Sequence, residues 1–190
     1  MKTNTPTVNA LSWLRVATAV AAAGLATGAM AQTTVRENTV RGREVRVELK
    51  HGDRAFLEKA AKASHEEIEI SRVAASRTSN PEVRRYAQML VSDHDDAREG
   101  IAALASLKGV NLPAKDPVAD RWVKRDGKSF DREYIDKMIS THEETVKLFD
   151  KQAKEGEDAE TVAYARKHLP KLQAHLQQGL DLKRVLKAQD

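Results

Sequence analysis

The chain has 190 residues, no cysteine, 32 lysine and arginine residues and 28 aspartate and glutamate residues. The absence of cysteine excludes a disulfide framework, a cysteine nucleophile and a metal–thiolate site. The excess of positive charge lies in the first 54 residues, so the rest of the chain is neutral and we expect no binding to nucleic acid.

The first 31 residues have the features of a secretory signal peptide. Lys2 and Arg15 precede an apolar run, and the run ends in the small-residue pattern Ala29-Met30-Ala31. Such a run is too short to span a bilayer, and it ends where a signal peptidase would cut. We predict cleavage after Ala31 and a periplasmic location. An uncleaved membrane anchor is the competing interpretation.

Residues 32–52 are rich in basic side chains and show no helical period. We interpret them as a disordered basic linker, which is either simply solvated or in weak contact with an anionic membrane surface. The sequence indicates no particular protein partner. The remaining residues, 53–188, are numerous enough for one domain with a hydrophobic core.

Two helices are predicted in the first half of this domain, at residues 53–77 and 81–108. Asp53 is the expected N-cap of the first helix. The pair Asn80-Pro81 is typical of a helix start, with asparagine as the cap and proline at the first helical position. Because the turn between the helices is short, they should pack as an antiparallel hairpin.

The segment 109–128 contains Gly109 and three further helix breakers, which predict a long connection with one short helical turn near residues 116–124. An extended segment of this length could travel from one end of a helical bundle to the other. We expect Trp122 to pack on the bundle and to hold the connection there.

Two further helices, at 129–154 and 158–187, form a second predicted hairpin. The two halves are similar: SHEEIEISRVA resembles THEETVKLFDKQA, and PEVRRYAQML resembles AETVAYARKHL, which puts Tyr86 and Tyr164 in matching positions. We predict an all-α fold, a ferritin-like four-helix bundle of two helical hairpins joined by a long crossover. The alternative is an up-down-up-down bundle in which the connection loops out.

Each predicted helix carries a protonatable side chain on its apolar stripe, and at 1.5 Å per residue these positions fall near the middle of the bundle. The candidates are Glu67, His94, His142 and His175, with His168, Asp93 and Glu69 as secondary candidates. Three interpretations remain open. The group is a buried hydrogen-bond network, a site for a divalent transition metal, or an acid–base site without metal.

Several imidazoles with one carboxylate suit Zn, Fe, Cu or Ni, and the sequence does not choose among them. In ferritin-like di-iron proteins a glutamate stands three residues before the ligand histidine on two of the helices. Here Val91, Ile139 and Leu172 occupy the positions three before the candidate histidines. A di-iron site is therefore not expected, and we favour a binding or structural protein over an enzyme.

Three stretches of the chain read FLEKAAKASHEEIEISRVAASRTSNPEVRRYAQMLVSDH, FDREYIDKMISTHEETVKLFD and YARKHLPKLQAHL. Together with GVNLP at 109–113, they resemble the exported bacterial proteins of domain-of-unknown-function family 4142. The resemblance implies a ferritin-like helical bundle of the cell envelope, discussed with stress functions, and it supplies no reaction. The residues that match the family pattern include Glu67, Glu69, Asp93, His94, His142 and His175.

Overall fold

The computed structural model describes residues 49–114, 118–125 and 129–188. The predicted signal peptide and the predicted linker up to residue 48 lie outside the described residues. Leu49, the first described residue, is buried, so the end of the predicted linker already packs on the helices. No described helix combines the length and the apolar character that crossing a membrane requires.

The described residues form five helices and no strand. Four of the helices are long, and one is a single short turn of helix in the connection. They are α1 (His51–Arg77), α2 (Pro81–Leu107), α3 (Ala119–Val123), α4 (Phe130–Glu155) and α5 (Ala159–Ala188). An all-helical fold is thereby confirmed.

The boundaries of α2 follow from local chemistry that the sequence displays. The Asn80 side chain accepts hydrogen bonds from the backbone nitrogens of Glu82 and Val83, at 2.9 and 3.3 Å, and Pro81 is the first helical residue. At the other end, Gly109 has a φ of 65°, a conformation that favours glycine. The predicted cap and the predicted stop are both confirmed.

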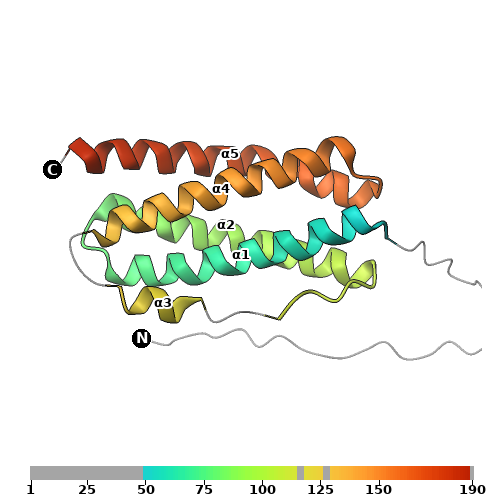
Figure 1. Ribbon diagram of the computed structural model, residues 1–190, viewed down its shortest axis with the longest axis horizontal. Helices are drawn as coiled ribbons and strands as arrows, with labels where there is room; N and C mark the ends of the chain where they lie inside the picture. Colours follow the sequence, from blue (N-terminus) through green and yellow to red (C-terminus); the bar gives the residue numbers. More distant parts are fainter. Residues whose placement is uncertain (1–48, 115–117, 126–128, 189–190) are drawn as a thin grey trace, which may run out of the picture. The chain divides into compact units, whose positions relative to one another are not determined.

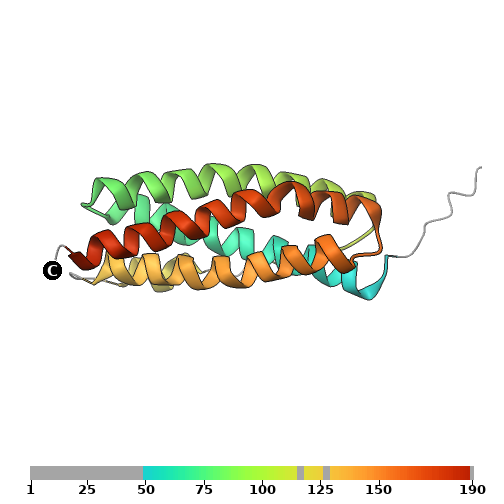
Figure 2. The ribbon, with the colours of Figure 1, turned by 90° about the horizontal axis from the view of Figure 1, so that it is seen from above.

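The four long helices pack as two antiparallel hairpins, α1 with α2 and α4 with α5 (Figure 1). Across the hairpins, α1 contacts α4 and α2 contacts α5. Figure 2 shows the same arrangement from above, with α5 between α2 and α4 in that view. The result is a helical bundle in which every long helix has two long neighbours.

The connection between α2 and α4 runs from one end of the bundle to the other. Val110 packs in an apolar cluster with Phe56, near the start of α1. Val118 and Trp122 pack in a second apolar cluster with Ile70, in the second half of α1. The chain therefore returns along the bundle before α4 begins, and Trp122 packs on it as expected.

These two apolar clusters leave a polar layer between them. On α1 the first cluster ends at Ala60 and the second begins at Ile70, and the same gap occurs on α2 and α4. The gaps contain buried polar residues, among them Glu67, His94 and His142, and His175 lies at the corresponding point of α5. The middle of the core is thus protonatable, between two apolar clusters.

The two hairpins are related by matched contacts between α2 and α5. The Tyr86 hydroxyl donates to the carbonyl oxygen of His175 at 3.0 Å, and the Tyr164 hydroxyl donates to that of Ala97 at 2.7 Å. Each tyrosine also lies over a glycine of the opposite helix, where a Cβ would meet the ring or hydroxyl at 3.0 Å: Gly179 for Tyr86 and Gly100 for Tyr164. The internal repeat therefore brings α2 and α5 close together in the same way at two levels.

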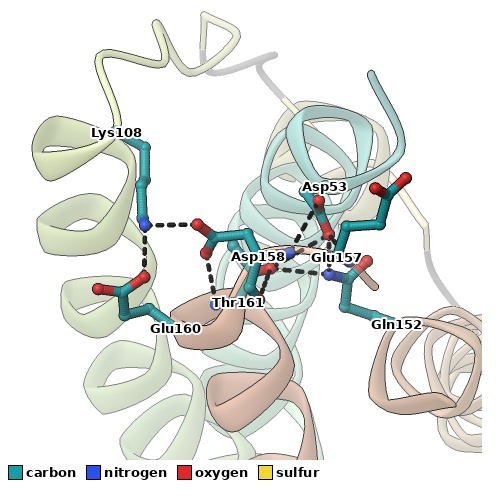
Figure 3. Close-up of polar contacts among 7 residues, drawn as sticks. All are labelled: Asp53, Lys108, Gln152, Glu157, Asp158, Glu160 and Thr161. Carbon is teal, nitrogen blue, oxygen red and sulfur yellow. Dashed lines mark hydrogen bonds and ion pairs between the residues drawn. The ribbon is translucent and has the colours of Figure 1, made fainter. Parts of the chain in front are cut away.

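One end of the bundle is tied together by Asp53 (Figure 3). This carboxylate, 2% exposed, accepts hydrogen bonds from Gln152, Thr161 and the backbone nitrogens of Glu157 and Asp158. Asp53 is not the N-cap of α1, as the sequence predicted. The helix begins earlier, with Lys50 in the cap position, and Asp53 instead binds the turn between α4 and α5.

Candidate metal centre

The polar layer brings one side chain from each long helix into a single buried cluster. Glu67 comes from α1, His94 from α2, His142 from α4 and His175 from α5, and none is more than 3% exposed. The three imidazole rings lie 5.4 to 5.6 Å apart, centre to centre. One ligand atom from each histidine falls within 4.8 Å of the others. We call these four residues the core cluster.

Glu67 lies among the histidines. Its Oε2 is 2.8 Å from Nε2 of His94 and 3.5 Å from Nε2 of His142. Neither approach has the alignment of a hydrogen bond, so within the described part of the chain both Glu67 oxygens and both His94 nitrogens lack a hydrogen-bond partner. Four buried polar atoms in this state are unusual, because each such atom costs roughly 1 to 3 kcal/mol.

The other two histidines each use one ring nitrogen and leave one free. His142 donates through Nδ1 to the carbonyl oxygen of Met138, at 2.9 Å, and His175 donates through Nε2 to Asp93, also at 2.9 Å. Since a carbonyl and a carboxylate only accept, these bonds fix the tautomers. The lone pairs then remain on Nε2 of His142 and Nδ1 of His175, which have no partner among the described residues.

This arrangement is the one found around metal-bound histidines. A ligand histidine commonly donates its second ring N–H to a carbonyl or a carboxylate, which orients the ring and raises its basicity. Asp93 is itself held by Lys171, whose Nζ lies 2.8 Å from its second oxygen. The core cluster therefore has a supporting shell on α4 and on α2.

The electrostatics divide the cluster into one charged pair and two neutral imidazoles. Burial opposes the charge on Glu67, yet His94 and His142 outweigh burial and lower the pKa of its carboxyl. Burial likewise opposes the charge on His94, and Glu67 outweighs it and raises the pKa of that imidazole. Burial lowers the pKa of His142 and lowers that of His175 to about 4. Two neutral imidazoles are thus available as ligands at neutral pH.

The spacing of the histidine nitrogens permits a common metal ion after a small adjustment. Transition metals bind imidazole nitrogen at about 2.0 to 2.1 Å, so two ligand atoms of one ion stand no more than about 4.2 Å apart. The histidine ligand atoms lie within 4.8 Å of one another in this structure, which exceeds that value by about 0.6 Å. The three histidines could therefore hold a single ion if the ligand atoms moved slightly closer together.

The secondary candidates lie outside the core cluster. Glu69 pairs with Arg72 at 3.1 Å on the surface of α1. His168 is only half-buried and stacks on the ring of Tyr164, with 4.3 Å between centroids, so the expectation that it faces inward with His175 is corrected. Asp93 is not a member of the cluster but supports it through His175.

Sequence reasoning missed the partners of Asp93. Adjacent helical residues point about 100° apart, so Asp93 cannot orient its neighbour His94. The actual partners, Lys171 and His175, lie on α5. No local signal marks this contact, because it depends on which face of α5 packs against α2.

The comparison with protein-family models matches residues 38–182 to the domain of unknown function DUF4142. The chain belongs to this family. The match includes α1, α2 and α4 entirely and α5 up to residue 182, and therefore all four residues of the core cluster. The resemblance noted in the sequence is thereby confirmed. None of the curated proteins matches the DUF4142 chain.

Solved structures with the same fold come from a second helical family and from a conserved hypothetical protein. A DUF305 fragment from Deinococcus radiodurans is 11% identical, with a TM-score of 0.62, and the match covers 71% of this chain and 97% of that one. A DUF305 protein from Streptomyces coelicolor, provisionally described as secreted, is 17% identical with a TM-score of 0.62, covering 72% and 94%. A conserved hypothetical protein from Mycobacterium tuberculosis is 16% identical with a TM-score of 0.58, covering 70% and 90%. At these identities the likeness concerns the fold alone.

Proposed function

We propose that this DUF4142 protein is an exported helical-bundle protein that binds one divalent transition-metal ion in its core. Glu67, His94, His142 and His175 are the ligands. The observation that carries the proposal is that these four residues bury ligand atoms without a hydrogen-bond partner. In His142 and His175 the other ring nitrogen is already bound, to the carbonyl oxygen of Met138 and to Asp93. An ion at this point would bind the Glu67 carboxylate, one ring nitrogen of His94 and the free ring nitrogens of His142 and His175.

The chemistry of the donor set limits the choice of ion. Imidazole-rich sites with one carboxylate suit Zn²⁺, Cu²⁺, Ni²⁺ or Fe²⁺ and are poor for Ca²⁺ and Mg²⁺, which prefer oxygen. A di-iron centre needs more carboxylates than the one in the cluster. The proposed activity is therefore binding of a single ion, with no reaction assigned to it.

The alternative is a structural network with no ion. It is favoured by the approach of Glu67 to His94 at 2.8 Å and by the opposite pKa changes of these two groups, which describe a buried ion pair. A buried ion pair is weak evidence for stability, because desolvation offsets the attraction. It also leaves the free lone pairs of His142 and His175 unexplained.

Export and topology belong to the same proposal. The signal peptide at 1–31, the linker that follows and a periplasmic location are inferred from the sequence, and one structural neighbour is provisionally described as secreted. A ferritin-like topology is supported by the connection that runs the length of the bundle between α2 and α4. N-terminal sequencing of protein from the periplasmic fraction should begin at Gln32; a chain that keeps its N-terminus in the membrane fraction would contradict cleavage.

The metal is tested on untagged protein stripped with a chelator, incubated with Zn²⁺, dialysed and analysed for bound metal. We expect close to one equivalent in the wild-type protein and none in His142→Ala. The matched control is His168→Ala, which removes a nearby histidine outside the cluster and should retain the ion.

A structural network predicts the reverse outcome. Wild-type protein would then hold no metal, and His142→Ala would destabilise the metal-free fold by roughly 1 to 3 kcal/mol through lost hydrogen bonding. That pair of results would contradict the proposal.

A further inference from the structure

The four members of the core cluster are not equally close to solvent. The side chains of Glu67 and His142 are 0% exposed, whereas those of His94 and His175 are each 4% exposed. The two slightly exposed histidines lie on α2 and α5. The side of the cluster that faces solvent is therefore the α2–α5 side.

A small cleft leads to these two histidines from outside. Its volume is about 20 Å³, and its lining includes Asp93, His94, His168, Lys171 and His175. Such a space holds about one water molecule. A fully hydrated divalent ion does not fit, so an ion that uses this route must lose water and a side chain at the rim must move.

The lining of the cleft includes the ion pair between Asp93 and Lys171. Asp93 is 21% exposed and Lys171 is 54% exposed, so both reach the solvent. One Asp93 oxygen binds Lys171 at 2.8 Å and the other binds His175 at 2.9 Å. Asp93 is also the carboxylate in the lining of the cleft, which makes it the oxygen ligand nearest to the outside.

We propose that the metal ion reaches the core cluster through this α2–α5 cleft, with Asp93 as the first ligand and Lys171 as the residue that closes the route. The inference rests on the proposed function. An arriving divalent ion replaces the lysine on Asp93, and the lysine turns outward into solvent. The ion then exchanges Asp93 and its remaining waters for His175 and His94, after which Lys171 rebinds Asp93. Lys171 is a positioning residue and does not touch the bound ion.

A closing residue has a kinetic signature that an electrostatic effect does not share. Removing it lowers the barrier in both directions, so association and dissociation accelerate together and affinity stays nearly constant. Removing a positive charge alone would speed association and slow dissociation. An exposed ion pair is a weak interaction, so the expected acceleration is about threefold to fivefold.

The chain supplies a matched control on the same helix. Lys183 binds Asp136 on α4 with an Nζ–Oδ1 distance of 2.8 Å, and its side chain is 56% exposed. Lys183 therefore matches Lys171 in its distance to a carboxylate and in its exposure, and it lies away from the cleft, with a partner aspartate that is more exposed, at 54% against 21%. Lys183→Gln removes the same charge from α5 without opening the route.

The test follows the visible absorption of Co²⁺ after stopped-flow mixing with the stripped full-length protein, and its loss after addition of excess chelator. We expect Lys171→Gln to raise both rates about threefold to fivefold, Lys171→Arg to resemble wild type, and Lys183→Gln to change neither rate. Unchanged rates in Lys171→Gln, or equal effects of the two glutamine variants, would overturn the access route while leaving metal binding intact. If the wild-type protein develops no Co²⁺ absorption at equilibrium, the proposed function fails and the access route fails with it.

Discussion

Asp53 and Glu67 lie on the same helix, are both essentially inaccessible to solvent, and differ in every contact. Asp53 accepts four hydrogen bonds from the α4–α5 region, and Figure 3 shows how these donors converge on it. Glu67 lies among three histidines, and neither of its oxygens has an aligned donor within the described residues. The Asp53 carboxylate is thus satisfied by hydrogen bonds within the protein, and the Glu67 carboxylate is not.

The contrast separates a carboxylate that supports the fold from one that is available to a ligand. Burying a carboxylate is costly unless hydrogen bonds compensate for the lost water. Asp53 receives that compensation from backbone and side-chain donors, whereas Glu67 receives it from the neighbouring histidines, chiefly His94 and His142. An added cation would compensate the Glu67 carboxylate for the loss of water, as hydrogen bonds already do for Asp53.

The largest expected effect is on the stability of the metal-free protein. Asp53→Ala should cost about 3 to 4 kcal/mol, because it leaves two backbone N–H groups without an acceptor and removes one of the hydrogen-bond acceptors of Gln152 and of Thr161. Glu67→Gln, which keeps the volume and removes no aligned hydrogen bond, should cost about 1 kcal/mol or less. Urea denaturation of the two stripped variants measures the difference. Equal losses would mean that Glu67 supports the fold as Asp53 does.

The next effect is stabilisation by metal. Zn²⁺ at 100 times its dissociation constant should add about 2.7 kcal/mol to the free energy of unfolding and raise the melting temperature by roughly 5 to 10 °C. Glu67→Gln should lose most of this increase, and Asp53→Ala should keep it despite its lower starting point. Calorimetric melts with and without Zn²⁺ provide the comparison. A zinc-induced shift that persists in Glu67→Gln would place the ion elsewhere.

A smaller effect is expected at the supporting shell. Asp93→Asn keeps a side chain of the same shape but weakens the bond that orients His175, so metal affinity should fall by about tenfold to a hundredfold. Competition with a chelating dye gives the affinity. Asp136→Asn, an exposed aspartate paired with Lys183, is the control and should have no effect.

The pH dependence of metal affinity depends on the unequal pKa values of the histidines. Glu67 raises the pKa of His94, so this imidazole is the first of the three to take up a proton as the pH falls, whereas burial lowers the pKa of His142 and of His175 and keeps both neutral. Affinity should therefore fall about tenfold per pH unit as the pH decreases from 7. It should fall more steeply near pH 4, where His175 also takes up a proton. Three ordinary histidines would instead lose about a thousandfold per unit below pH 6.5, and an affinity that stays constant between pH 7 and pH 4 would contradict histidine ligation.

Local sequence signals predicted the helices well. The Asn80-Pro81 start and the Gly109 stop are determined by neighbouring residues, so the sequence alone was sufficient to find them. Periodicity placed Glu67, His94 and His142 on apolar stripes, and the structure buries all three. This burial could be predicted because the apolar stripe of each helix can be read from the sequence of that helix alone.

Contacts between distant segments could not be predicted in the same way. Asp53 looked like a helix cap, and its role at the α4–α5 turn depends on residues more than one hundred positions away. His168 and His175 share a stripe at helical spacing, but only His175 meets the other histidines, because the angle between α5 and its neighbours decides which turn reaches the centre. Which residues meet in the core cluster depends on how the four helices pack, and no local sequence pattern specifies that packing.

The most direct test of the central claim is X-ray absorption spectroscopy at the zinc edge on full-length protein loaded with one equivalent of Zn²⁺. We expect a first shell of nitrogen and oxygen at about 2.0 to 2.1 Å, with outer scattering from three imidazole rings that is lost in His142→Ala, where the added zinc stays hydrated. A spectrum of hydrated zinc without imidazole scattering, or one that His142→Ala leaves unchanged, would contradict a metal site in the core of the bundle.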